Sequence, residues 1–445
     1  MSTLVAAARP PAELLLRGAH LIDPNEGIDA PHDVLVRDGV IAEIGAPASL
    51  AAPPGAQTVE AEGKHLFPGF VDPHVHLRSP GQEHKEDLET GTRAAAAGGY
   101  CAVVAMANTD PVLDSPALLR GMQMTAARDA RIPVGFIAAI SVGLAGERLT
   151  EMAELREVGA VGFSDDGKPV ADAGLLRHAL RYQRLCGGVL ALHEEDPALS
   201  GAGVMGEGAV SVELGLAGIP SISESTMIAR DALIAEHEQG RVHFQHLSTR
   251  RSIDALAGAR ERGVKVSGEV TPHHLLLTDE DVRTLDTSFK MNPPLRTAAD
   301  RLALVEALRD GTIECIATDH APHAHDEKNV PFEVAPMGTT GLECSFAVLY
   351  TDLVLPGVIA LAVLLERLTA GARLFDLDVP AIVVGRSANL CLIDLQAGWR
   401  VGEAGYESRS SNCCFAGRDV QGRTLLTLAD GAVAYRERAF ALSAA

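Results

Sequence analysis

The chain lacks the marks of a secreted or membrane-embedded protein. Its seven cysteines are odd in number and scattered, and no two of them form a CxxC pair, which favours reduced thiols over a disulfide framework. No uninterrupted apolar run reaches about 18 residues, so we expect no membrane-spanning helix. Residues 1–11 contain no apolar core followed by a cleavage-like site. We therefore expect a cytoplasmic location.

Positive charge is also scarce. The sequence has 38 basic and 59 acidic residues, a formal net charge of −21, and this charge would repel nucleic acids and anionic membranes. A small molecule is therefore the expected partner. The sequence does have 47% hydrophobic residues and 43 glycines within 445 residues, which predicts a large core divided by many turns. Two domains are expected, since a barrel of about 250 residues leaves room for a second unit.

The two ends of the chain share one pattern, in which apolar and polar residues alternate over short runs, as in half-buried antiparallel strands. These runs are LLLRGAHLID, HDVLVRDGVIAEIGAP and QTVEAEGKHLF near the N-terminus, and NLCLIDL, NCCFAGRDV and GRTLLTLADGAVAYR near the C-terminus. We interpret them as one small β-sandwich built from both termini. The predicted divisions are residues 13–66 and 376–440 for this sandwich, with residues 67–375 between them.

The middle of the chain has short, continuous apolar runs, each followed by a polar turn and a stretch of helical periodicity. Such βα units are typical of a parallel sheet buried on both faces. The eight runs are residues 69–76, 100–108, 132–140, 160–166, 188–193, 242–247, 265–273 and 313–320. Eight runs predict an α/β fold of the (β/α)₈ TIM-barrel type, in which functional side chains lie at the carboxyl ends of the strands.

Histidines and aspartates occur where these runs end. His74 and His76 are two positions apart on one run, so both side chains leave the same face and can bind one metal ion. Four further candidates end other runs: Asp166, His193, His246 and Asp319. Nitrogen and carboxylate ligands suit Zn²⁺, and six candidates would serve one or two ions. A zinc ion lowers the pKa of bound water toward about 7 and polarises a carbonyl group, and Asp319 is the predicted catalytic base.

Several longer segments narrow the interpretation. They are GFVDPHVHLRSPGQEHKED, AMANT, GFSDDGKPV, LHEED, FQHLSTRRSID, VTPHHLLLTDED, MNPPLR and ATDHAPHAHDEK. Together they resemble the type I dihydroorotases of the amidohydrolase superfamily, and the resemblance extends from about residue 13 to residue 440. HxH alone marks only the superfamily, whereas HLRxPGQExKE followed by MNPPLR points to this subgroup. The resemblance also implies a (β/α)₈ barrel with an accessory β-sandwich from both termini.

The resemblance implies roles for individual residues. His74, His76 and Asp319 would bind a first metal ion, His193 and His246 a second, and Asp166 both. The implied substrate is N-carbamoyl-L-aspartate, closed reversibly to L-dihydroorotate in pyrimidine biosynthesis. Substrate contacts would come from Arg78, Asn108, Asn292 and His323. The planar guanidinium of Arg78 suits bidentate binding of a carboxylate. The resemblance further implies a homodimer, with association with aspartate carbamoyltransferase as a further partner.

Two alternatives stay open. Hydantoinases, dihydropyrimidinases and allantoinases resemble this chain but bridge their metals with a carbamylated lysine, and the corresponding position here is Asp166. Asp165 and Lys168 are the neighbours that could replace Asp166 in this role. The second alternative is a non-catalytic, structural partner of aspartate carbamoyltransferase, but every expected ligand is present. Among other residues, the acidic run HEED (193–196) is expected to form a solvated face or helix start, and Lys328 to be solvated.

Overall fold

The computed structural model describes residues 4–440 and 443–444, and an eight-stranded parallel sheet forms its larger part. The strands are, in their order around the sheet, β15 (Cys315–Ile316), β14 (Lys265–Val270), β13 (Arg241–Phe244), β10 (Leu190–Leu192), β9 (Gly162–Phe163), β8 (Val134–Ala138), β7 (Tyr100–Ala105) and β6 (Phe70–Val75). Beyond β15 the chain pairs with β6, where the amide of His76 donates to the carbonyl of His320 at 2.9 Å. Each predicted run contains one strand, and the (β/α)₈ barrel is confirmed.

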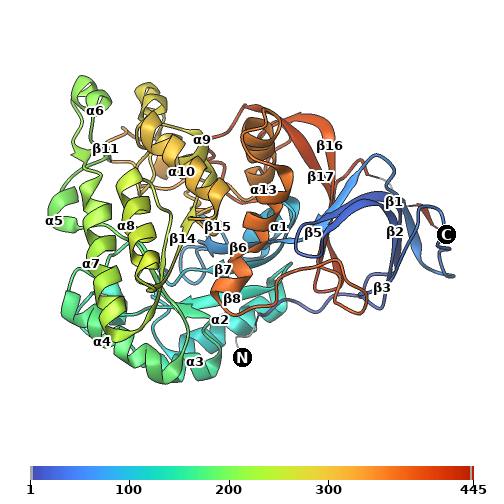
Figure 1. Cartoon of the computed structure of the whole chain (residues 1–445), viewed down its shortest axis with the longest axis horizontal. Coiled ribbons are helices and arrows are strands. Elements are labelled where there is room, and N and C mark those ends of the chain that lie inside the picture. The colour runs from blue at the N-terminus through green and yellow to red at the C-terminus, as the bar shows by residue number, and fades with distance from the viewer. Residues whose placement is uncertain (1–3, 441–442, 445) are drawn as a thin grey trace.

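Helices surround this sheet, seen at the left of Figure 1. In α4 the buried residues Leu176, Ala179, Leu180 and Gln183 follow helical spacing, and the Asp172 side chain accepts the amide of Leu175 to start the helix. The helices are α1 (Leu88–Ala97), α2 (Pro116–Asp129), α3 (Met152–Val158), α4 (Ala173–Cys186), α5 (Pro197–Ser200), α6 (Ala209–Leu214), α7 (Ile222–Glu238), α8 (Arg250–Glu261), α9 (Pro272–Leu276), α10 (Ala298–Asp310), α11 (His325–Lys328), α12 (Ser345–Leu349), α13 (Leu361–Thr369) and α14 (Gly371–Leu374). Among the described residues, no helix combines the length and apolarity needed to cross a bilayer.

A second, nine-stranded sheet joins the two ends of the chain, at the right of Figure 1. Its main path runs β18–β17–β16–β5–β1–β2–β3, while β4 pairs with both β1 and β19. The strands are β1 (Leu14–Asp23), β2 (Ile28–Arg37), β3 (Val40–Gly45), β4 (Gln57–Glu60), β5 (His65–Pro68), β16 (Leu390–Arg400), β17 (Asp419–Ala429), β18 (Ala432–Arg436) and β19 (Ser443–Ala444). A separate apolar core, which includes Leu16, Val34 and Leu426, fills it. The prediction of an accessory unit built from both termini is confirmed.

One expected strand is absent from this sheet. In NCCFAGRDV only Asp419 and Val420 belong to a strand, whereas residues 412–418 form a loop. The loop pairs with the barrel: the carbonyl of Asn412 accepts the amide of Thr340 at 3.0 Å. The β interpretation of residues 412–418 was therefore wrong, because backbone groups in this loop bond to a barrel loop where a strand would need a neighbouring strand.

A small parallel pair, β11 (Met205–Gly206) and β12 (Gly218–Ile219), lies in the long connection after β10. Helices α5 and α6 belong to the same connection. This insertion is therefore an elaboration on the barrel rather than a further domain, and it leaves the carboxyl ends of the eight strands as the common edge at which the candidate residues meet.

Candidate metal centre

The six candidate ligands come from five of the eight barrel strands, β6, β9, β10, β13 and β15. His74 lies within β6, whereas the other five follow their strands by one to three residues: His76, Asp166, His193, His246 and Asp319. Two of them, His246 and Asp319, have positive φ angles of 33° and 47°. Non-glycine residues seldom adopt this conformation, and such residues concentrate at functional sites. The chain therefore turns sharply as it leaves the strands and directs these side chains inward.

The carboxylate of Asp166 lies at the centre of four histidines. Its Oδ1 is 3.5 Å from Nε2 of His74, 3.5 Å from Nε2 of His246 and 3.6 Å from Nδ1 of His193. Its Oδ2 is 3.5 Å from Nε2 of His76. All of these residues are buried. A carboxylate in this place can share its two oxygens between two cations.

Asp319 completes the cluster on the side of His74 and His76. Its Oδ1 is 2.9 Å from Nε2 of His76 and 3.5 Å from Nε2 of His74. Burial by itself would raise the pKa of Asp319, but the charge of His74 and the hydrogen bond from His76 outweigh burial and lower it. Asp319 is therefore ionised at neutral pH.

The neighbours of Asp166 have other places. Asp165 accepts the amides of Ile140 at 2.8 Å and Ser141 at 3.0 Å, so its side chain is fixed against the end of β8. Lys168 is exposed in the turn that follows. The structure thus brings Asp166, and neither Asp165 nor Lys168, to the four histidines. Asp165 points elsewhere because adjacent residues of a strand face opposite sides.

Three of the four histidines donate the ring N–H that points away from the cluster. His74 Nδ1 donates to Glu269 Oε1 at 2.7 Å, His76 Nδ1 to Asn108 Oδ1 at 2.9 Å, and His193 Nε2 to Glu195 Oε2 at 3.2 Å. With its outward nitrogen engaged in this way, each ring directs its other nitrogen toward the centre, where it would offer a lone pair to a bound ion in place of a proton. Metal-binding histidines are oriented by partners of this kind.

The unsatisfied atoms of the cluster fit a cation. Within the described part of the chain, Nε2 of His74 and Oδ1 of Asp166, which lie 3.5 Å apart, are buried without a hydrogen-bond partner, although buried polar atoms are nearly always bonded. The ligand atoms of His74, His76 and Asp319 form one compact group, and those of His74, Asp166 and His246 another, each within 4.8 Å. Imidazole and carboxylate donors together suit Zn²⁺ and similar divalent ions.

Arg78 and His323, two of the predicted substrate-binding residues, lie next to this cluster. Nε of Arg78 donates to the carbonyl of Pro322 at 3.1 Å, and in the described chain its terminal nitrogens make no hydrogen bond. Burial, with the charge of Arg78 as a second cause, lowers the pKa of His323 to about 3, so His323 is neutral. Its Nε2 donates to the carbonyl of Met337 at 2.8 Å. Its buried Nδ1 makes no hydrogen bond within the described residues, and the nearest carboxylate oxygen, Oε2 of Glu327, lies 3.5 Å away. These two side chains thus offer a cationic fork and a nitrogen acceptor.

The two predicted asparagines, Asn108 and Asn292, make hydrogen bonds to side chains in and around the cluster. Nδ2 of Asn108 donates to Oδ2 of Asp166 at 3.0 Å, in addition to the bond from His76. Nδ2 of Asn292 donates to Oε2 of Glu195 at 2.5 Å and lies 3.3 Å from Nε2 of His193. Asn108 therefore orients the candidate ligands His76 and Asp166, and Asn292 orients Glu195, the partner of His193. Their contact with substrate stays a prediction.

Several buried charges escaped the sequence interpretation. The expectation that the run HEED is mostly solvated was wrong for Glu194, which is buried, and for Glu195, which bonds His193. Lys328 is also buried rather than solvated, and its Nζ donates to three backbone carbonyls. Glu269 was missed although its position inside the apolar strand β14 is a recognisable signal, since an isolated carboxylate in such a strand needs a partner.

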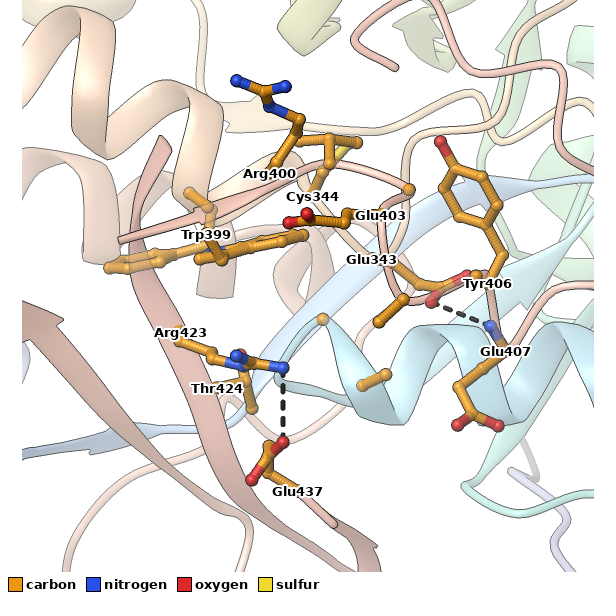
Figure 2. A pocket seen from close by; sticks show the side chains of 18 of the residues that line it. Glu343, Cys344, Trp399, Arg400, Glu403, Tyr406, Glu407, Arg423, Thr424 and Glu437 are labelled. Atoms are coloured by element: carbon orange, nitrogen blue, oxygen red, sulfur yellow. Dashed lines mark hydrogen bonds and ion pairs between the residues drawn. The ribbon is translucent and has the colours of Figure 1, made fainter. Parts of the chain in front are cut away.

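A separate pocket of about 210 Å³ lies away from these residues (Figure 2). It is bounded by the end of α1, by the segment 399–407 and by strand β17, and Trp399, Tyr406 and Glu343 contribute to its lining. None of the predicted site residues lines it. The candidate metal centre and this pocket are therefore distinct features of the molecule.

Sequence comparisons place the chain among named proteins. Residues 63–252 match the family described as "Dihydro-orotase-like". The chain is 47% identical over 424 residues to the dihydroorotase of Geobacter sp. (strain M21), with 95% of this chain and 99% of that protein covered. It is 42% identical over 426 residues to the dihydroorotase of Acetivibrio thermocellus, with 96% and 99% covered.

Solved structures share the whole architecture. The L-hydantoinase (dihydropyrimidinase) of Arthrobacter aurescens aligns with a TM-score of 0.84 at 25% identity and covers 95% of this chain and 96% of its own. The D-hydantoinase (dihydropyrimidinase) of Thermus sp. aligns with a TM-score of 0.81 at 27% identity, with 96% of each chain covered. Both alignments cover the barrel and the accessory sheet together.

Proposed function

Because this chain belongs to the dihydroorotase family, we propose that it interconverts N-carbamoyl-L-aspartate and L-dihydroorotate as a zinc-dependent enzyme of the type I subgroup. The observation that carries the proposal is Asp166, whose carboxylate lies within 3.6 Å of a nitrogen of each of four histidines. The hydantoinase pattern has a lysine at this position. An aspartate there favours the dihydroorotase assignment over a hydantoinase.

We assign the metal ligands as predicted from the sequence: His74, His76, Asp166, His193, His246 and Asp319. Zinc bound there would activate water and polarise the amide carbonyl. The protein contributes the tautomers, because Glu269, Asn108 and Glu195 each accept the outward N–H of a histidine. The three ring orientations are thereby fixed before an ion binds, which reduces the reorganisation that binding requires.

Substrate recognition would use Arg78 and His323, which lie next to the cluster. Arg78 is held at its Nε by the carbonyl of Pro322, which leaves the terminal nitrogens for a carboxylate of the substrate. His323 cannot donate from Nδ1, because its single ring hydrogen is on Nε2 and bonds Met337. We therefore assign Nδ1 of His323 as the acceptor of a ring N–H of the cyclic amide.

Asp319 would move the proton during ring opening. The carboxylate is ionised at neutral pH and lies beside His76, so it can take a proton from the attacking water. It then passes this proton to the leaving amide nitrogen, which otherwise would depart as a poor, anionic leaving group. In the cyclisation direction the same carboxylate removes the proton from the ureido nitrogen.

Other features of the assignment follow the sequence interpretation. We propose residues 67–375 as the catalytic barrel, with residues 13–66 and 376–440 as the accessory unit. All seven cysteines are free, which favours a reducing compartment, and we propose the cytoplasm. A homodimer and association with aspartate carbamoyltransferase stay predictions.

The decisive experiment compares three cyclic amides on the purified, zinc-loaded protein. We expect hydrolysis of L-dihydroorotate, with dihydrouracil and allantoin almost untouched, and we expect Asp166→Ala to abolish it. Zinc content is measured on the same samples. A preference for dihydrouracil would move the chain to the hydantoinases, and a folded, metal-free, inactive protein would indicate a structural role.

A further inference from the structure

Asn412 reaches the barrel from the accessory unit. It lies in the loop between β16 and β17, and its side chain is buried, with 6% of the residue exposed. The residues that it contacts belong to two loop segments on the substrate side of the barrel, residues 321–323 and residues 338–340. A residue distant in sequence thus lies within the wall of the candidate site.

The side-chain amide of Asn412 joins these two segments. Its Oδ1 accepts the backbone amide of His323 at 3.0 Å. Its Nδ2 donates to the carbonyl of Ala321 at 3.1 Å and to the carbonyl of Gly338 at 3.2 Å. One acceptor and both donors are in use, which also fixes the orientation of the amide.

The two joined segments meet at His323. The carbonyl of Met337 accepts Nε2 of His323 at 2.8 Å. Gly338 follows directly with a φ of 138°, and a Cβ at this position would lie 3.0 Å from the same Nε2. The imidazole is therefore packed against the backbone that Asn412 holds, and a shift of either segment would turn Nδ1 of His323.

The loop that carries Asn412 is itself anchored on the barrel. The carboxylate of Glu343 accepts the amides of Glu407 at 2.9 Å and Ser408 at 3.0 Å; Figure 2 shows the first of these bonds. The amide of Arg409 donates to Glu86 at 3.1 Å, and the hydroxyl of Ser410 donates to the carbonyl of Lys85 at 2.6 Å. The backbone on the N-terminal side of Asn412 is therefore held against the barrel by hydrogen bonds.

We propose that Asn412 is a positioning residue for substrate binding, which acts through His323 by locking the segments 321–323 and 338–340 together. The accessory unit thereby takes part in recognition of the cyclic amide. This inference rests on the proposed function, since it assigns His323 to the substrate. The described residues include no hydrogen bond between Asn412 and a candidate metal ligand, so we expect zinc binding not to depend on it.

The test uses Asn412→Asp, which keeps the acceptor for His323 but places a carboxylate against two carbonyl oxygens. We expect KM for L-dihydroorotate to rise roughly tenfold, as the loss of one or two hydrogen bonds predicts, with kcat changed far less and zinc content unchanged. The matched control is Asn389→Asp. Asn389 also caps a backbone amide, that of Asp430 at 2.7 Å, but it lies beside Cys101 and Pro133 at the opposite ends of the barrel strands.

A double-mutant cycle with His323→Ala separates positioning from general damage. If Asn412 acts through His323, Asn412→Asp adds little to KM once the imidazole is gone. Multiplicative effects of the two changes, a fall in zinc content, or an unchanged KM in Asn412→Asp would each overturn the proposal.

Hydrogen exchange of the His323 amide gives a readout that needs no substrate. In Asn412→Ala this amide loses its acceptor, and we expect it to exchange faster than in the wild type and in Asn389→Ala. Unchanged exchange contradicts the positioning role. If this amide exchanges faster in Asn412→Ala but the wild type does not hydrolyse L-dihydroorotate, the link between Asn412 and His323 stands and the proposed function is rejected. Failure of the positioning role and failure of the proposed function are therefore distinguishable.

Discussion

Replacing Glu269 with glutamine tests whether the buried carboxylate beneath His74 prepares the metal site. Oε1 of Glu269 accepts Nδ1 of His74 at 2.7 Å, and Oε2 accepts Nε2 of His243 at 3.0 Å. Burial alone would raise the pKa of Glu269, but His74 and the hydrogen bonds from both histidines lower it to about 2. The group is therefore an anion throughout the neutral range, inside the barrel.

These contacts predict that Glu269→Gln lowers the affinity for zinc. Glutamine keeps the shape and one acceptor, but the charge-assisted bond to His74 becomes a neutral one of roughly half its strength. Its amide can also turn its NH₂ toward His74, which would favour the tautomer with a hydrogen on Nε2, the atom that faces the cluster. Outer partners of metal-binding histidines typically contribute about 10- to 100-fold in affinity, so we expect zinc affinity to fall by about 1.4 to 2.7 kcal/mol.

The assay is competition for zinc with a chelator of known affinity, followed by measurement of the folded fraction. The control is Glu314→Gln: Glu314 accepts the amide of Gly268 at 2.8 Å on the same strand, but its side chain is one-third exposed and lies outside the cluster. If Glu269→Gln binds zinc as tightly as the wild type, Glu269 does not prepare the metal site. An equal loss of zinc affinity in Glu314→Gln would refute the same idea.

Three further outcomes are expected. Asp319→Asn should lower kcat for L-dihydroorotate at least about 100-fold, because the proton acceptor is lost; steady-state rates in both directions check it. Arg78→Lys should raise KM about tenfold, because the charge remains while the planar fork is lost; a matched fall in kcat instead would contradict carboxylate binding. Burial raises the pKa of Glu343 from 4.5 to about 7. Since the folded pKa exceeds the unfolded one, the contribution of Glu343 to stability is complete below about pH 4.5 and is lost as pH rises through about 7. Between about pH 5 and about pH 9 the wild type should therefore lose roughly 3 kcal/mol more unfolding free energy than Glu343→Gln, measured by urea titration.

The sequence predicted the barrel because its signals are local. Short apolar runs separated by helical stretches appear in every βα unit, and each predicted run contains one strand of the sheet. The alternation along a strand likewise placed His74 and His76 on one side. The candidate ligands at other strand ends could be named for the same reason, because a closed parallel barrel brings all its carboxyl ends to one edge.

The remaining features depend on contacts between segments far apart in the chain. The separation of Asp165 from Asp166 required the end of β8, where two amides bind Asp165. The burial of Lys328 required three carbonyls from other loops. In the sequence these residues look like ordinary polar residues of turns, because nothing nearby in the chain distinguishes a solvated charge from a paired one.

The sequence by itself thus determined the barrel, the shared terminal sheet and the residue types of the candidate metal centre. Tertiary structure alone decided which nitrogen of His74, His76 and His193 faces the centre, through Glu269, Asn108 and Glu195. It also decided that Asn412, in a segment with the pattern of a strand, leaves its sheet and bonds the loops around His323. Periodicity reports which face of an element is buried, whereas the partner of a buried polar group is set by the elements that pack against it.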